Sequence, residues 1–169
     1  MNPAPFRFET LGEGHDRTSF RCGEDALDRY FQVQATQDIR RRITNCFVMV
    51  DAVSGLVAAY YTLSAASIPL VDLPADEAKR LPRYPTLPAV RIGRLAVDRR
   101  FQGRGLGAAL LMNAADRTLQ GDAAAFALLV DAKNDQAVGF YRHYGFRTLV
   151  SRPGTLFLPL KTAQKLFHQ

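Results

Sequence analysis

Three closely spaced glycines lie between a run of strand-forming residues and a run of helix-forming residues. The segment reads Gln102, Gly103, Arg104, Gly105, Leu106 and Gly107. At such a helix start the backbone N–H groups lack partners within the helix, and the helix dipole favours an anion. Glycine lets the backbone approach a phosphate closely. We therefore predict a phosphate loop at residues 102–107, although a tight turn packed against a strand would also favour glycine.

The familiar nucleotide-binding motifs do not describe this loop. Its glycines do not match G-x-G-x-x-G, and the Gly-Lys-Ser/Thr ending of the P-loop is absent. The loop alone therefore does not identify its phosphate ligand, and the neighbouring sequence is needed to indicate which class of ligand binds.

Hydrophobic patterning predicts alternating strands and helices around the loop. Strands are expected at 6–9, 46–50, 56–63, 90–97, 124–130, 146–150 and 155–160. Helices are expected at 26–31, 38–42, 75–81, 105–119 and 135–144, with a further helical turn or two in 161–169. Five prolines in 69–88 predict a long connection, because proline breaks central strands and long helices. This order predicts an α/β (α+β) fold, in one domain that spans residues 1–169.

The composition is that of a globular protein that is neither secreted nor embedded in a membrane. Of its 169 residues, 47% are hydrophobic and 22% are charged. No stretch is apolar enough to span a bilayer, and the N-terminus lacks a secretory signal, so we expect a cytoplasmic protein. Cys22 and Cys46 are expected to be free thiols. No histidine lies at ligand spacing from them, so we expect no metal site.

The basic residues are mostly arginines. Of 22 lysines and arginines 18 are arginine, and the net charge is +6. Arginine binds phosphate in a bidentate fork, so this bias favours a phosphate-rich ligand, with room for a polyanion such as RNA. A solvated basic surface is the alternative interpretation.

A second motif lies downstream of the glycine loop. It runs from Asn134 through Phe140 and Tyr141 to Gly145 and Phe146. Together with the glycine loop it resembles the two signatures of GNAT acetyltransferases, Q/R-x-x-G-x-G/A and N-x-x-A-x-x-F-Y-x-x-x-G-F, in the same order. The resemblance implies a single mixed, splayed sheet of about six to seven strands flanked by helices.

The same resemblance implies acetyl-CoA as the cofactor and assigns its contacts. Pantetheine would pair with main-chain groups of Leu95, Ala96 and Val97, and Asn134 would lie near it. The pyrophosphate would lie on the backbone amides of residues 102–107. A backbone N–H at the end of the 90–97 strand would polarise the thioester carbonyl.

Tyr141 is the candidate general acid for the departing thiolate, since a phenol with a pKa near 10 suits that role. The alternative is an aromatic residue that only packs against Phe140 and Phe146. Tyr144, one helical turn on, is expected to be structural. No general base can be assigned, although three carboxylates are candidates: Glu9, Asp98 and Asp135.

Within the family, the chain resembles toxins of type II toxin–antitoxin modules that acetylate aminoacyl-tRNA. The resemblance lies in residues 20–31, which match F-x-C-G-x-x-x-L-D-x-(Y/F/W)-(F/L), and in Gly93 to Asp98, which read G-R-L-A-V-D. It implies a homodimer, a ribbon-helix-helix antitoxin and an aminoacyl-tRNA substrate. The candidate RNA contacts are Arg40, Arg41, Arg42, Arg91 and Arg94, with Arg152 a further basic residue.

Three alternatives stay open at this stage. Arg40 to Arg42 would also suit a solvated helix face. A GNAT enzyme that acetylates a small amine, a peptide or a protein N-terminus would share every cofactor residue. A module that binds coenzyme A or RNA without catalysis is a third, against which Tyr141 argues.

Overall fold

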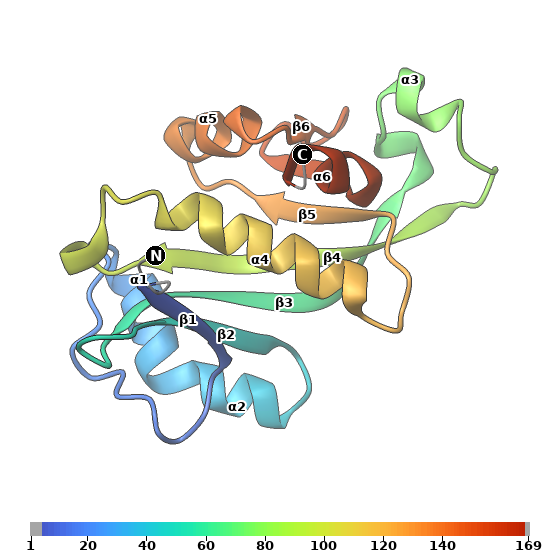
Figure 1. The fold of residues 1–169 in the computed structure, drawn as a ribbon. Coiled ribbons are helices and arrows are strands. Elements are labelled where there is room, and N and C mark those ends of the chain that lie inside the picture. Colours follow the sequence, from blue (N-terminus) through green and yellow to red (C-terminus); the bar gives the residue numbers. More distant parts are fainter. Residues whose placement is uncertain (1–4, 168–169) are drawn as a thin grey trace. The chain divides into compact units, whose positions relative to one another are not determined.

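The computed structural model describes residues 5–167 (Figure 1). Its seven strands form a mixed sheet in the order β1-β2-β3-β4-β5-β7-β6. The predicted mixed sheet with flanking helices is thus confirmed. The chain divides into two compact units, the first made of the described parts of Met1–Ser64 with Gly93–Asn113, and the second of Ala65–Ile92 with the described part of Ala114–Gln169.

The first unit contains most of the N-terminal half of the chain. Its elements are β1 (Phe6–Thr10), α1 (Asp25–Arg29), the π-helical turn η1 (Tyr30–Gln34), α2 (Ala35–Arg40), β2 (Asn45–Asp51), the start of β3 (Val57–Pro69), the end of β4 (Thr86–Val97), the 3-10 turn η3 (Arg99–Phe101) and the start of α4 (Leu106–Gln120). β1 pairs antiparallel with β2, and β2 with β3. The predicted hairpin at 46–63 is therefore confirmed.

Two adjacent tyrosines of β3 show which helices cover the strands of this unit. The Tyr60 hydroxyl donates to the backbone oxygen of Leu27 in α1, and the Tyr61 hydroxyl donates to Asn113 in α4. Because successive side chains of a strand point to opposite faces, α1 and the start of α4 lie on opposite faces of β3. The Tyr60 ring also stacks on Phe31, with centroids 4.3 Å apart, in a core that includes Phe20 and Ala96.

The second unit contains the C-terminal strands. Beyond its parts of β3, β4 and α4, it holds the 3-10 turn η2 (Leu70–Asp72), α3 (Ala75–Ala78), β5 (Ala127–Asp131), α5 (Asp135–His143), β6 (Arg147–Thr148), β7 (Thr155–Pro159) and α6 (Leu160–Phe167). β4 pairs parallel with β5, and β7 pairs antiparallel with both β5 and β6. β5 is buried from Ala127 to Val130, which explains its continuous apolar run.

The proline-rich connection contains more strand than predicted. β3 continues to Pro69 and β4 already begins at Thr86, so Pro88 lies inside a strand. Proline cannot donate to a ladder, but it can accept, and the Pro88 carbonyl accepts the N–H of Phe126. The expectation that the prolines exclude strand throughout 69–88 was wrong at both ends.

Several predicted boundaries also need correction. α3 ends at Ala78 rather than at 81, and the strand predicted at 146–150 is reduced to Arg147–Thr148. α2 runs from Ala35 to Arg40 rather than over 38–42, because Arg42 has a φ of 61° and ends the helical geometry. The predicted C-terminal turns form α6, and residues 168–169 of that prediction lie outside the described residues.

The structure also bears on two compositional predictions. Cys22 and Cys46 are free thiols, as expected. Among residues 5–167, no helix is both long and apolar enough to cross a membrane.

Candidate functional site

The phosphate loop lies open between β4 and α4 within the first unit. Residues 102–105 are exposed, and α4 begins at Leu106. Gly103 and Gly105 have φ values of 82° and 75°, and a Cβ at either position would meet no atom within 4 Å. Glycine is therefore required by backbone conformation rather than by lack of space. The N–H groups of the first helical turn lack intrahelical acceptors, so the loop and the helix start offer an anion site.

A buried carboxylate, Asp98, lies at the base of the loop and is 1% exposed. Asp98 accepts hydrogen bonds from the backbone N–H of Arg21 at 3.0 Å and from that of Arg100 at 2.8 Å. It also accepts from the Arg100 guanidinium at 2.9 Å. Burial acts to raise the pKa of Asp98, but these hydrogen bonds outweigh it and hold the pKa below its usual value. Asp98 is thus a charged structural group and is excluded as the general base.

Gln102 supports the loop through its side chain. Its amide nitrogen donates to the backbone oxygens of Cys22 and Val97, both at 2.9 Å. Close by, Gly23 has a φ of 104°, and a Cβ there would come within 3.5 Å of the Arg99 guanidinium. The N-terminal block (residues 20–31), known from sequence only as a family signature, therefore holds the phosphate loop in place. Because its side-chain amide nitrogen is engaged, Gln102 would contact a phosphate through its backbone N–H.

The end of β4 carries the three residues expected to meet pantetheine. Ala96 is buried in the core of the first unit, while Leu95 and Val97 are half-buried. On either side of them, the Arg94 N–H donates to the Thr62 hydroxyl and the Asp98 N–H donates to the carbonyl of Ala58. These two amides are engaged within the protein, so neither is available to polarise a thioester.

Asn134 and Tyr141 both belong to the second unit. Asn134 caps α5, since its side-chain oxygen accepts the N–H of Ala137 at 2.9 Å. The Tyr141 ring packs edge-on against Phe140 and Phe146, with centroids 5.2 and 5.4 Å away. This packing fixes the position of the ring, and it is common to both interpretations of Tyr141. Burial raises the pKa of Tyr141 to about 12, so the phenol keeps its proton at neutral pH.

The other predicted residues differ in how they are engaged. Tyr144 packs against Phe140 and His143, in keeping with a structural role. Glu9 bonds to His15 and Arg7, and these contacts hold its pKa below the usual value. Glu9 is therefore a poor candidate for a base. Asp135 lies in the first turn of α5.

The predicted RNA-contacting arginines fall into two classes. Arg40, Arg41 and Arg42 are exposed at the end of α2. Arg91 pairs with Asp131, so its charge already has a partner within the second unit. Arg152 similarly pairs with Asp72, at 3.3 Å.

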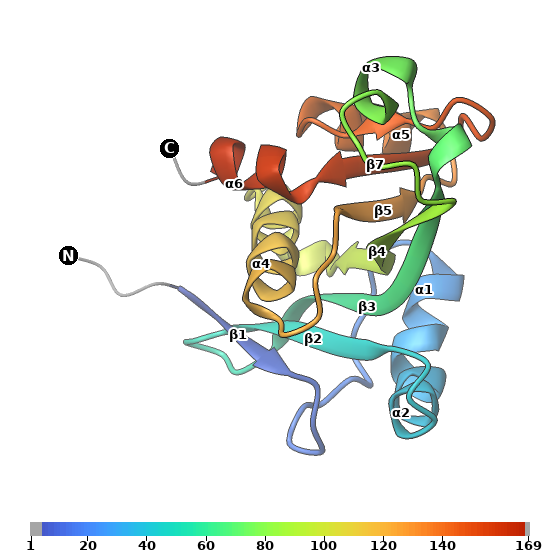
Figure 2. The same ribbon diagram turned by 90° about the vertical axis from the view of Figure 1, so that its right-hand side faces the viewer.

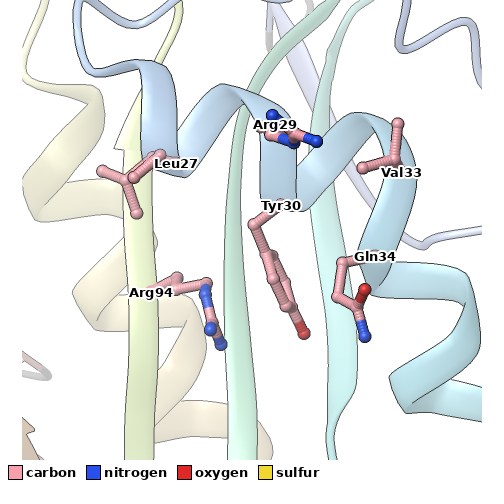
Figure 3. Close-up of a pocket in the computed structure, with 7 residues that line it drawn as sticks. Leu27, Arg29, Tyr30, Val33, Gln34 and Arg94 are labelled. Carbon is pink, nitrogen blue, oxygen red and sulfur yellow. The ribbon is translucent and has the colours of Figure 1, made fainter.

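Arg94 lies in a pocket that sequence reasoning did not find (Figure 3). Its guanidinium carbon is 3.5 Å from the centroid of the Tyr30 ring. The Arg94 pocket, of about 380 Å³, is lined by Ala26, Leu27, Arg29, Tyr30, Val33, Gln34 and Arg94. Most of these residues come from α1 and η1. A π-helical turn shifts the helical period by one residue, so the spacing of apolar residues gave no signal for it.

Comparison with known proteins identifies relatives that align with at least 90% of this chain. Residues 81–157 match the family model of an acetyltransferase (GNAT) domain. A tRNA-acetylating toxin of Mycobacterium tuberculosis is 35% identical over 158 residues, which cover 92% of this chain and 93% of that protein. A probable toxin TacT of Sinorhizobium fredii is 29% identical, over 90% of this chain and 89% of that protein.

Solved structures of the proteins KacT and AtaT have folds similar to that of this chain. A tyrosine-to-phenylalanine variant of KacT has a TM-score of 0.87 and 29% identity, and it covers 97% of this chain and 100% of its own. AtaT complexed with acetyl-methionyl-tRNAfMet has a TM-score of 0.85 and 31% identity, over 96% and 99% of the two chains. An AtaT variant bound to the C-terminus of the antitoxin AtaR has a TM-score of 0.81 and 28% identity, over 98% and 100%.

Proposed function

This chain is an N-acetyltransferase of the GNAT family, and from that premise we propose that it transfers the acetyl group of acetyl-CoA to the α-amine of aminoacyl-tRNA. The observation that carries the proposal is similarity along nearly the whole chain to a tRNA-acetylating toxin, at 35% identity over 92% of the residues. The fold match to AtaT in complex with acetyl-methionyl-tRNAfMet supports the same substrate class.

The phosphate loop is proposed to bind the pyrophosphate of acetyl-CoA. Backbone amides of Gln102, Gly103, Arg104, Gly105, Leu106 and Gly107 would donate to its oxygens. Two features of the structure support this role: the loop is exposed, and it is held by Asp98 and by the Gln102 side chain. A loop fixed in this way loses little conformational freedom when it binds an anion.

Tyr141 is proposed to supply the proton of the leaving group. The amine nitrogen attacks the thioester carbonyl carbon, the carbon–sulfur bond breaks, and the thiolate takes the phenolic proton. The nitrogen loses its own proton to solvent, and the Tyr141 phenolate regains a proton from solvent. Because burial raises the pKa of Tyr141 to about 12, the donor is fully protonated at the start of each turnover.

No strong base is assigned, and none is required for this substrate. The α-amine of an aminoacyl ester has a low pKa, so a sizeable fraction is neutral at physiological pH. The bonded carboxylates of Glu9 and Asp98 agree with a mechanism in which the enzyme selects the neutral amine.

The remaining assignments follow from the family and from the surface charge. Leu95, Ala96, Val97 and Asn134 are proposed to contact pantetheine, and residues 1–169 to act as one acetyltransferase domain. Arg40, Arg41 and Arg42 are proposed as RNA backbone contacts because all three are exposed. Arg91 is a weaker candidate, since it pairs with Asp131.

An antitoxin partner is supported by the solved complex of AtaT with the C-terminus of AtaR. We propose that an antitoxin of the ribbon-helix-helix type likewise binds this chain. We also propose that this chain is a homodimeric, cytoplasmic toxin.

The proposal is tested by label transfer from radiolabelled acetyl-CoA. The purified protein is offered charged tRNA, deacylated tRNA, small amines and peptides. Label on charged tRNA alone, falling steeply with added salt, is the expected result, since phosphate contacts release counterions. Label only on small amines or peptides would leave the acetyltransferase intact and overturn the RNA substrate.

A further inference from the structure

We propose that the Arg94 pocket binds the 3′-terminal nucleotide of the RNA substrate, with the base stacked on the Arg94 guanidinium. This inference rests on the proposed aminoacyl-tRNA substrate and specifies where the RNA end is held. The pocket volume of about 380 Å³ lies within the range of small-ligand sites, which is about 300–1,000 Å³.

The charge of the pocket favours an anionic occupant. Two of its lining residues, Arg29 and Arg94, are cationic. One carboxylate, that of Asp38, lies beside the lining and accepts from Tyr30 and Gln34, so the two arginines leave an excess of positive charge. Leu27 and Val33 add apolar walls, and Val33 is 61% exposed although it is aliphatic. A nucleotide combines the two properties that such a pocket selects, a flat apolar base and a charged phosphate.

The position of the Arg94 guanidinium would let a base stack on it. Its guanidinium lies over the Tyr30 ring, and Figure 3 shows both side chains within the pocket. A planar guanidinium that is covered by a ring on one face can stack a base on the other face.

Tyr30 is itself fixed in position. Its hydroxyl donates to Asp38 at 2.8 Å, and Gln34 donates to the same carboxylate at 3.1 Å. The Gln34 carbonyl oxygen then remains as an acceptor for the edge of a base.

The position of the pocket along the chain fits this ligand. Arg94 immediately precedes Leu95, the first residue of the segment expected to meet pantetheine. In aminoacyl-tRNA the reactive amine is joined through one ester to the terminal nucleoside. A subsite for that nucleoside therefore belongs next to the strand that holds the thioester.

The test compares Arg94→Lys with wild type. Lysine keeps the charge and loses the planar face, so we expect KM for charged tRNA to rise about tenfold. Affinity for acetyl-CoA and the salt dependence of KM should stay unchanged, because no phosphate contact is lost. Arg17→Lys is the matched control, because Arg17 lies over the Phe31 ring outside the pocket, and its KM should stay at the wild-type value.

A second variant and a competing ligand test the pocket without relying on the Arg94 substitution alone. Ala26→Trp fills the exposed side of the pocket and should raise KM in the same way, with the melting temperature confirming the fold. The trinucleotide CCA should compete with charged tRNA against wild type, and about tenfold more weakly against Arg94→Lys. Equal inhibition of the two proteins, or an unchanged KM in both variants, would overturn the nucleotide subsite. If wild type acetylates no charged tRNA, the proposed function itself fails.

Discussion

The carboxylate of Asp98 accepts the backbone N–H of Arg21 at 3.0 Å, across 77 positions of the sequence. This bond joins the N-terminal block to the base of the phosphate loop. Asp98 is buried and also bonds to Arg100, so one side chain sets the position of two segments that family motifs describe separately. The proposed cofactor site therefore depends on residues far from it in sequence.

Replacement of Asp98 by asparagine should destabilise the protein. The amide would place donors against the N–H groups of Arg21 and Arg100, and hydrogen bonds to a charged group contribute about 1.5–3 kcal/mol each. We expect the free energy of unfolding to fall by roughly 2 kcal/mol or more, measured by urea denaturation. Asp122→Asn, in an exposed loop, is the control and should be neutral. Equal stability of Asp98→Asn and wild type would contradict the structural role.

The difference in unfolding free energy between wild type and Asp98→Asn should depend on pH. Hydrogen bonds hold the pKa of Asp98 below its usual 3.8 in the folded state. A lowered folded-state pKa contributes stability that is complete above the unfolded pKa and is lost as pH falls through the folded value. The stability difference between wild type and Asp98→Asn should thus be constant above about pH 5 and shrink below about pH 4. A difference that grows on acidification would have the wrong sign.

Tyr141→Phe should slow acetyl transfer without weakening cofactor binding. General acid catalysis contributes about 100-fold or more, while the ring contacts with Phe140 and Phe146 are kept. Single-turnover rates and calorimetric titration with acetyl-CoA separate the two effects. Tyr144→Phe is the matched control and should keep the wild-type rate. A Tyr141→Phe enzyme at full rate would remove the assignment of the acid.

Two glycine-to-alanine changes should act in opposite directions. Gly105 has a φ of 75°, so alanine there should cost about 1 kcal/mol and weaken acetyl-CoA binding as the loop shifts. Gly139 lies exposed within α5 with no atom near its added Cβ, so alanine there should stabilise by roughly 0.5–1 kcal/mol. Thermal denaturation measures both. Stabilisation by Gly105→Ala would mean that the loop does not need its left-handed backbone.

Arg42→Gly should improve stability and impair RNA binding together. Arg42 has a φ of 61°, a conformation that glycine adopts freely at a helix end, so we expect a gain of about 0.5–1 kcal/mol. If Arg42 contacts a phosphate, KM for charged tRNA should rise, and the slope of log KM against log salt should fall by about 1. A more stable variant with unchanged salt dependence would support the solvated-face interpretation of Arg40 to Arg42.

The sequence predicted the order of elements because local patterns determine most of them. The apolar run before Asp131 marked β5, and Gly145, with a φ of 95°, marked the end of α5. Strand ends near prolines were less predictable. Whether Pro88 interrupts a strand depends on its hydrogen-bonding partner, Phe126, which is distant in sequence.

The same limit applies to the site. Gln102 was expected in the phosphate loop, but the bonds of its side chain to Cys22 and Val97 depend on folding. Arg94 is a candidate RNA contact from sequence, yet its stacking on Tyr30 involves a π-helical turn that no residue pattern indicates. Residue type indicated which side chains are candidates, and only tertiary contacts showed how each is held.

The most direct measurement is the chemical identity of the product. Charged tRNA is incubated with the protein and acetyl-CoA, digested with nuclease, and the released terminal nucleoside is analysed by mass spectrometry. We expect adenosine that carries an N-acetylated aminoacyl group, formed by wild type and strongly reduced with Tyr141→Phe. Adenosine with an unmodified aminoacyl group, under conditions where the protein acetylates another amine, would contradict it.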